Sequence, residues 1–167
     1  MENKAYIGLG GNIGDPRSAM ARALRLLNTV KGVAVRRVSS IYRTPPWGKT
    51  DQPDFLNAAA ELETTLTPRE LLDLCLETEL ALKRIRAERW GPRIIDIDIL
   101  KFGEEAIVEK GLEIPHPRML DRAFVLLPLA EIAPQLDLSG DTAHNRAMNA
   151  DKSGIEKLAV ELDWWLQ

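Results

Sequence analysis

The chain has 167 residues, enough to bury a core and short enough to form one domain over residues 1–167. Hydrophobic residues make up 45% and charged residues 28%, which excludes disorder, collagen and coiled coil as whole-chain descriptions. The net charge of −3 argues against binding a nucleic-acid backbone by bulk charge. The single cysteine, Cys75, cannot form an intramolecular disulfide, and no apolar run approaches the roughly 20 residues of a membrane span. We therefore expect a cytoplasmic protein with neither a membrane nor a nucleic-acid partner.

The first half of the chain predicts a strand, a helix and two further strands. Residues 5–9 are a short apolar run followed by glycines, which is typical of a buried strand and a turn. Asp15 and Pro16 then have the character of a helix N-cap and a first-turn proline. Residues 33–42 are rich in β-branched side chains and predict a second strand, and 55–62 predict a third.

The second half predicts a long helix, a strand and two more helices. Thr67 and Glu70 have the spacing of a capping box at the start of a leucine-rich helix. Residues 94–102 give the clearest strand pattern in the chain, and 122–132 predict a helix that Ala-Pro closes. In the polar tail we expect a helix over 154–162.

The order of the six main elements predicts the fold class. Strand, helix, strand, strand, helix, strand is the βαββαβ order of an α+β, ferredoxin-like sandwich, with helices covering one face of a mostly antiparallel sheet. Additional C-terminal elements follow this unit. A doubly wound parallel sheet is the competing arrangement, and it fits less well because no helix separates the second and third strands.

Four glycines (Gly8, Gly10, Gly11 and Gly14) lie between the first strand and the first helix. A glycine loop before a helix is one way to bind phosphate, because free backbone N–H groups there attract anions. The spacing is not that of a dinucleotide-binding or P-loop motif, however. We therefore interpret the glycines as a tight turn that needs positive φ angles.

Two aspartates alternate with isoleucines in the strand over 94–102. Because side chains on a strand alternate between its two faces, Asp96 and Asp98 project from one face and the isoleucines from the other. Two like charges on one face repel each other, and a hard cation such as Mg²⁺ relieves that repulsion. A solvated outer face of an ordinary strand is the alternative interpretation.

The segment 83–93, directly before this strand, is strongly basic. It holds five cations (Lys83, Arg84, Arg86, Arg89 and Arg93) against one acid, Glu88, in a chain that is acidic overall. Arginine forks beside a metal-binding carboxylate pair suit a polyphosphate. A solvated helix end explains two of the cations through the helix dipole, but not those that flank Trp-Gly-Pro.

Four segments, in order, resemble the 6-hydroxymethyl-7,8-dihydropterin pyrophosphokinase family of the folate pathway. Residues 89–100, RWGPRIIDIDIL, resemble its signature, and residues 6–15 resemble its first strand and glycine turn. Residues 39–57, from Ser-Ser-Ile-Tyr-Arg-Thr-Pro-Pro to Asp-Phe-Leu-Asn, resemble its pterin loop, and residues 114–124 resemble its C-terminal motif. Together the segments span most of the chain.

The resemblance implies Mg²⁺-dependent transfer of the pyrophosphoryl group of ATP to the hydroxymethyl oxygen of the pterin, with release of AMP. By position, Asp96 and Asp98 would hold two Mg²⁺ ions that bridge the triphosphate. Arg84 and Arg93 match the catalytic arginines, which would steady charge on the transferring group. ATP and the pterin are the implied small-molecule partners, and we expect a monomer.

The same resemblance assigns the two binding sites by position. A flat heterocycle is well held between two aromatic rings, with polar groups reading its edge. The pterin-binding positions are Thr44, Pro45, Pro46, Phe55, Asn57, Trp90 and Phe124. The ATP-binding positions are Glu79, Arg86, Trp90, Ile99, His116 and Arg122.

Two other classes of protein remain compatible with the residue patterns alone. One is a metal-dependent nucleotidyltransferase or nuclease, because paired carboxylates on a sheet also suit two-metal chemistry on nucleic acid. The other is a non-catalytic ferredoxin-like binding module in which the two aspartates are a surface feature. The first predicts salt-sensitive binding of nucleic acid, and the second predicts nucleotide affinity that does not respond to Mg²⁺.

Overall fold

The computed structural model describes residues 2–46, 51–85 and 94–167, without the side chains of 84 and 85. Its centre is a six-stranded sheet in the order β10-β3-β4-β1-β5, with β2 pairing β4 beside β3. Every pairing in this sheet is antiparallel. The strands are β1 (Asn3–Gly11), β2 (Val33–Val38), β3 (Tyr42–Thr44), β4 (Phe55–Thr64), β5 (Asp96–Phe102) and β10 (Glu156–Lys157).

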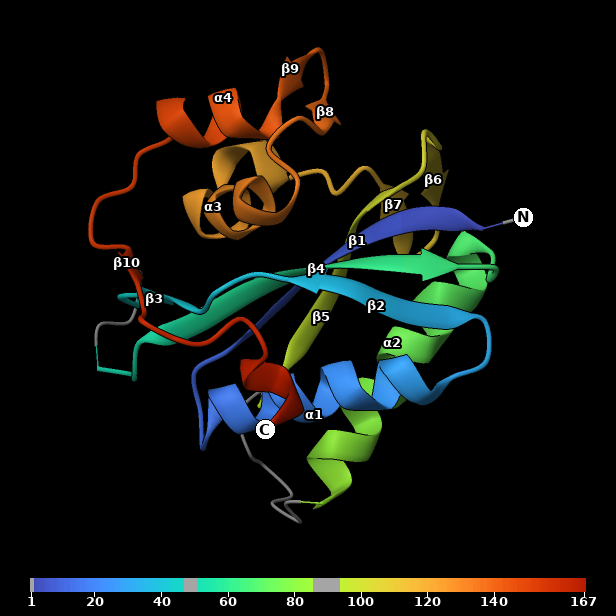
Figure 1. The fold of residues 1–167 in the computed structure, drawn as a ribbon, viewed down its shortest axis with the longest axis horizontal. Helices are drawn as coiled ribbons and strands as arrows, with labels where there is room; N and C mark the ends of the chain where they lie inside the picture. The colour runs from blue at the N-terminus through green and yellow to red at the C-terminus, as the bar shows by residue number, and fades with distance from the viewer. Residues whose placement is uncertain (1, 47–50, 86–93) are drawn as a thin grey trace.

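Helices cover both faces of this sheet (Figure 1). The helices α1 (Pro16–Thr29) and α2 (Pro68–Ile85) lie on one face, and α3 (Ala123–Ile132) lies on the other with α4 (Ala143–Asn149) packed on it. The βαββαβ order and the antiparallel sheet confirm the predicted fold class. The expectation that helices cover only one face was wrong, because the sheet presents apolar side chains on its second face as well.

Two hydrophobic cores result, one on each face. Ile95, Ile97 and Ile99 of the β5 region are buried with Cys75 of α2 in the core beneath α1 and α2. The second core joins Tyr6, Ala59 and Leu100 of the sheet to apolar residues of α3 and α4. The alternation along β5 thus sends the isoleucines to one side and leaves the intervening residues facing the α3 side.

Short elements connect and extend these layers. Two small hairpins and two 3₁₀ helices complete the described part of the chain, and the Ile114–Pro115 peptide bond is cis. The hairpins are β6 (Ile107–Glu109) with β7 (Leu112–Ile114) and β8 (Asp137–Leu138) with β9 (Asp141–Thr142). The 3₁₀ helices are Met119–Asp121 and Trp164–Leu166.

Both predicted helix starts follow their local signals. The Asp15 carboxylate accepts a hydrogen bond from the Ser18 N–H at 3.1 Å, and Pro16 opens α1. At α2, the Thr67 N–H donates to Glu70 Oε1 at 2.9 Å and the Glu70 N–H donates to Thr67 Oγ1 at 3.1 Å. The capping box is therefore formed in both directions.

The tail and the second strand differ from their predictions. The expected helix over 154–162 is absent from this described part of the chain, where Gly154 has φ +78° and β10 pairs with β3. The expected strand over 33–42 is two strands, because the Ser39 hydroxyl accepts from the Ala59 N–H of β4 and Ser40 bonds to Glu131 of α3. Tertiary partners override the local propensity in both places.

Candidate active site

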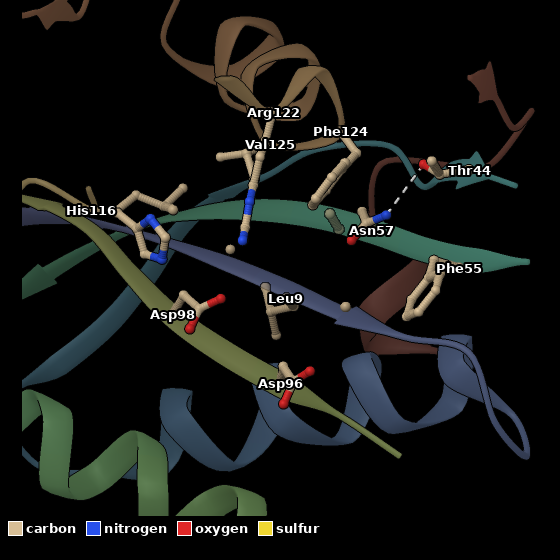
Figure 2. Close-up of a pocket in the computed structure, with 14 residues that line it drawn as sticks. Leu9, Thr44, Phe55, Asn57, Asp96, Asp98, His116, Arg122, Phe124 and Val125 are labelled. Carbon is tan, nitrogen blue, oxygen red and sulfur yellow. Dashed lines mark hydrogen bonds between the residues drawn. The ribbon is translucent and has the colours of Figure 1, made fainter. Parts of the chain in front are cut away.

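A cavity of about 220 Å³ lies between the sheet and the N-terminal end of α3 (Figure 2). Its floor comes from β1, β4 and β5, and the side chains of α3 and of the segment after β7 close it from above. It brings together eight of the residues that the sequence singled out. They are Thr44, Phe55, Asn57, Asp96, Asp98, His116, Arg122 and Phe124.

Asp96 and Asp98 lie side by side on β5 and project into the cavity, as Figure 2 shows. Asp98 is exposed and Asp96 half-buried, whereas Ile97 between them is buried on the opposite face. The predicted division of the strand into a carboxylate face and an isoleucine face is therefore what the structure contains. Both acids line the cavity.

Glu79 of α2 lies behind this carboxylate pair, outside the cavity lining. Its Oε2 accepts a hydrogen bond from the Ile97 N–H at 2.7 Å, which satisfies a donor at the outer edge of β5. Burial raises the pKa of Glu79, the Ile97 hydrogen bond and Lys83 lower it, and the charges of Asp96 and Asp98 raise it further. Glu79 therefore interacts electrostatically with Asp96 and Asp98, and its hydrogen bond to Ile97 connects α2 to the strand that carries them.

His116 closes the cavity above Asp98 (Figure 2). Its Nδ1 accepts a hydrogen bond from the Arg118 N–H at 3.2 Å, so the neutral ring carries its proton on Nε2. Desolvation lowers the pKa of His116 below its ordinary 6.5; Asp98 raises it and Arg122 lowers it. The imidazole is thus a neutral hydrogen-bond donor at neutral pH.

This predicts a titration that NMR can follow. The pKa of His116 is lowered in the folded state, so its contribution to stability is present above pH 6.5 and is lost as the pH falls through the folded pKa. We expect a folded-state midpoint below 6.5 in the Hε1 signal. The chain has two histidines, so His144→Gln assigns the signal. A midpoint above 6.5 would contradict the neutral-donor assignment.

An aromatic slot forms the other end of the cavity. Phe55 comes from β4 and Phe124 from α3, with Asn57 between them in Figure 2. The Asn57 Nδ2 donates to Thr44 Oγ1 at 3.4 Å, which links β4 to the end of β3. The Arg122 guanidinium carbon lies 5.7 Å from the centroid of the Phe124 ring, a cation–π contact that holds the two side chains together. A planar ligand fits such a slot.

Gly8 and Gly10 line the floor, a role that the sequence interpretation missed. They lie directly opposite Asp98 and Asp96 in the β1–β5 ladder, and both line the cavity. A Cβ atom at Gly10 would lie 2.6 Å from Oδ1 of Asn57. Only Gly14 of this segment has the positive φ expected of a turn, +70°. Glycine at alternate positions of a strand is the signal that could have indicated a close approach.

The remaining predicted residues do not line this cavity in the described structure. Pro45 and Pro46 directly follow Thr44, and the Ile99 side chain is buried in the core below α1 and α2. The Ile99 side chain therefore lies on the face of the sheet away from the cavity. The side chain of Arg84, and all of Arg86, Trp90 and Arg93, lie outside the described residues.

The sequence comparisons identify the family. The family model of 7,8-dihydro-6-hydroxymethylpterin-pyrophosphokinase (HPPK) matches residues 6–134. The chain belongs to the HPPK family. A 2-amino-4-hydroxy-6-hydroxymethyldihydropteridine pyrophosphokinase of Methylorubrum extorquens is 49% identical over 93% of this chain and 98% of its own length. A protein of the same name from Bacillus subtilis is 46% identical over 94% of this chain and 96% of its own length.

Solved HPPK structures share the fold. The wild-type HPPK-DHPS of Plasmodium falciparum, solved with STZ-DHP, superposes with a TM-score of 0.72 at 18% identity over 89% of this chain. A triple mutant with pteroate has the same TM-score and identity over 96% of it. The chain spans 43% and 47% of the length of those two fused chains. The ferredoxin-like HPPK fold is therefore that of this chain.

HPPK membership also decides between the classes of protein that the residue patterns left open. The chain is an ATP-dependent pyrophosphokinase, so the prediction of an enzyme with ATP as co-substrate is confirmed. The nuclease and binding-module interpretations are set aside. Among the described residues, none of the helices combines the length and the apolar character that membrane crossing requires.

Proposed function

We propose that this HPPK transfers the pyrophosphoryl group of ATP to the hydroxymethyl group of 6-hydroxymethyl-7,8-dihydropterin, releasing AMP, as a step of folate biosynthesis. One observation carries the proposal: a single cavity joins an aromatic slot to a carboxylate pair. The slot suits a flat heterocycle and the carboxylates suit the metal ions of a triphosphate. Because the slot and the carboxylates are adjacent, the cavity suits transfer of a pyrophosphoryl group from the triphosphate to the heterocycle.

The slot end is the proposed pterin site. Phe55 and Phe124 come from different elements and offer ring faces to a planar bicycle. Asn57 presents an amide whose donor is already engaged with Thr44 at 3.4 Å, which orients its Oδ1. That oxygen is then an acceptor for an N–H on the polar edge of the ring. Thr44 and the two prolines after it would complete this wall.

The carboxylate end is the proposed triphosphate site. Among residues 2–46, 51–85 and 94–167, no group of three His, Cys, Asp or Glu side chains could hold a metal ion. Mg²⁺ is commonly bound by one or two carboxylates together with substrate phosphates, so the pair Asp96 and Asp98 fits two Mg²⁺ ions that arrive with ATP. When bound, such ions neutralise phosphate charge and orient the attacking oxygen.

Two side chains at this end would bind phosphate directly. Arg122 projects from the start of α3 into the cavity. Two N–H groups of its guanidinium can donate to two phosphate oxygens there. His116 offers its Nε2–H as a neutral donor near Asp98. Both groups would hold the triphosphate so that its central phosphorus faces the slot.

Six further residues are assigned by sequence position. Arg84 and Arg93 are proposed to steady charge on the transferring group, Arg86 to bind ATP, and Trp90 to contact both the pterin and ATP. Ile99 would contribute its backbone at the edge of β5. Glu79 would act from behind the carboxylates, near that same edge.

The transfer needs no covalent intermediate on the protein. The hydroxymethyl oxygen attacks the β-phosphorus, a new O–P bond forms, and the bond from the β-phosphorus to the bridging oxygen of the α-phosphate breaks. AMP departs with that oxygen, and the hydroxyl proton leaves to solvent. Positioning and charge stabilisation carry such a step, which is what slot, carboxylates and arginines supply.

A product assay tests this function. Purified protein is incubated with ATP, Mg²⁺ and 6-hydroxymethyl-7,8-dihydropterin, and the nucleotides are separated. AMP that forms only when pterin and Mg²⁺ are both present is the expected result. ADP as the product would establish monophosphoryl transfer instead, and no turnover of a folded protein would contradict the proposal.

Phe124→Ala tests the slot. We expect about a 10- to 100-fold rise in the KM for the pterin, because stacking of a base on an aromatic ring contributes roughly 1–3 kcal/mol. The KM for ATP should rise less, through the loss of the contact with Arg122. Leu127→Ala, one turn further along α3, is the matched control. Equal effects of both variants on the pterin KM would contradict the stacking role.

A further inference from the structure

The carboxylate of Glu131, in the last turn of α3, makes three hydrogen bonds to the segment that leads into β3. Its Oε1 accepts from the Ser40 N–H at 3.0 Å and from the Tyr42 hydroxyl at 2.8 Å. Its Oε2 accepts from the Ser40 hydroxyl at 3.0 Å. Lys157 of β10 lies 3.9 Å away. A half-buried carboxylate with this many donors is fixed in one orientation.

The partners of Glu131 are themselves buried and held. Ser40 is 4% and Tyr42 is 6% exposed. Burial, and then the hydrogen bond to Glu131, raise the pKa of Tyr42, so the phenol stays a donor throughout the physiological range. The neighbouring Ser39 is bonded to Ala59 of β4 through both its backbone and its hydroxyl. The segment between β2 and β3 therefore has one position relative to the sheet, and Glu131 fixes α3 to it.

The three hydrogen bonds of Glu131 with Ser40 and Tyr42, which we call the clamp, connect the two walls of the cavity. Phe124 and Glu131 are seven residues apart on α3, two helical turns, and so lie on one side of the helix. On the sheet side, Tyr42 lies directly opposite Asn57 in the β3–β4 ladder, and Thr44 opposite Phe55. One end of α3 thus carries one ring of the slot, and the other end is bonded to the strand beside the second ring.

We propose that Glu131 is a positioning residue that sets the spacing between Phe124 and Phe55, and with it the fit of the planar substrate. The proposal rests on the pterin site of the proposed function. Without the three hydrogen bonds, α3 is held to the sheet by apolar contacts, which lack direction, and at its last residue by the Arg37 guanidinium of β2, which donates to the Ile132 carbonyl at 3.0 Å. The helix then samples several positions over the sheet, and only some of them leave a slot of the correct width.

Three variants distinguish a positioning effect of the clamp from a general loss of stability. Glu131→Ala removes all three hydrogen bonds. Glu131→Gln keeps them, because its amide oxygen accepts from Ser40 N–H and Tyr42 while its amide nitrogen donates to the Ser40 hydroxyl. Tyr42→Phe removes one part-buried phenol–carboxylate bond of the clamp.

Tyr6→Phe is the matched control for Tyr42→Phe. It removes a bond of the same kind, from the Tyr6 hydroxyl to Glu61 at 2.9 Å, between β1 and β4 within the sheet. Tyr6 is also 6% exposed. The two variants therefore lose a similar interaction, but only one of them loses a link between α3 and β3.

Steady-state kinetics is the first readout. We expect Glu131→Ala to raise the pterin KM about tenfold with a smaller change in kcat, and Glu131→Gln to stay within about twofold of wild type. Tyr42→Phe should raise the pterin KM, and Tyr6→Phe should not, at similar losses of thermal stability. Equal KM effects of Tyr42→Phe and Tyr6→Phe, or no recovery in Glu131→Gln, would overturn the positioning role.

A distance measurement keeps the test independent of turnover. Spin labels at Asp54→Cys, just before Phe55, and Asp121→Cys, just before α3, flank the slot at exposed positions. Cys75 is buried with its pKa raised to about 12, so it stays unlabelled. We expect Glu131→Ala to broaden the distance distribution, and Glu131→Gln and Tyr6→Phe to leave it as in the parent.

The kinetics and the label distances together distinguish failure of the proposed function from failure of the clamp proposal. If the wild-type protein forms no AMP from pterin and ATP, the proposed function fails, and the label distances alone decide whether Glu131 positions α3. If wild type is active and Glu131→Ala changes neither the pterin KM nor the label distances, the clamp proposal fails alone.

Discussion

Asp98→Asn is expected to lower kcat by on the order of 10³-fold, in line with the loss of one preorganised charge-stabilising group from a transfer site. The amide keeps the shape of the side chain but removes the negative charge that would bind Mg²⁺. Asp98 is exposed on β5 and faces the cavity, so the substitution leaves the packed isoleucine face intact.

The measurement pairs rate with Mg²⁺-dependent nucleotide binding. In wild type, ATP affinity should be much higher with Mg²⁺ than with EDTA, and Asp98→Asn should lose most of that difference. Asp73→Asn, an exposed aspartate on α2, is the control for a change of one charge. If Asp98→Asn keeps at least a tenth of the wild-type kcat, the proposed role of the Asp98 carboxylate in the transfer is wrong.

The same substitution has an electrostatic consequence at Glu79. The charge of Asp98 is one of the causes that raise the pKa of Glu79. Its removal should therefore lower that pKa and leave the Glu79 carboxylate more firmly ionised. Carbon-detected NMR of the side-chain carboxyl follows this shift directly, and an unchanged Glu79 titration would show that the two carboxylates do not share a field.

Local periodicity was enough to predict the carboxylate half of the site. The alternation of Asp96, Ile97 and Asp98 defines two faces whatever the rest of the chain does, because a strand has a period of two. The capping box at Thr67 was likewise predictable, since both of its partners lie within one helical turn. Signals of this kind need no tertiary information.

The slot and its floor could not be derived from local patterns. Phe55 and Phe124 are ordinary core candidates by residue type, and only the resemblance to HPPK assigned them to one pocket. Gly8 and Gly10 line the floor because β1 pairs with β5 in the register that places them opposite the aspartates. Register between distant strands is a tertiary property, so the glycines were interpreted as a turn.

The segments around Ser40 and after Gly154 show the same limit. Ser40 lies outside both β2 and β3, and Glu131, far along the chain, supplies acceptors for its N–H and its hydroxyl. The tail pairs with β3 instead of forming the predicted helix, and the Leu158 N–H donates to the Ile41 carbonyl at 2.8 Å. In both places, a hydrogen-bond partner from a distant element decides the local conformation.

Trp164→Ala is expected to cost about 3–5 kcal/mol of folding free energy, the usual range for removing a fully buried tryptophan side chain. Trp164 is 1% exposed and packs in the core beneath α1, near the end of the chain. Its indole Nε1–H donates to the Ser39 carbonyl at 2.9 Å, a bond that the variant also removes. For a domain of this size we expect the thermal midpoint to fall by on the order of 10 °C.

The neighbouring Leu166 provides the matched control. It lies in the same 3₁₀ turn but is 57% exposed, so Leu166→Ala should change the free energy of unfolding by about 0.5 kcal/mol or less. Urea unfolding of both variants gives the comparison, with equal slopes showing that the folded states are equally compact. If Trp164→Ala is as stable as Leu166→Ala, the C-terminal segment contributes little to the folding free energy. The expected large difference would make it part of the core that supports Ser39, Ser40 and, through them, the wall of the substrate slot.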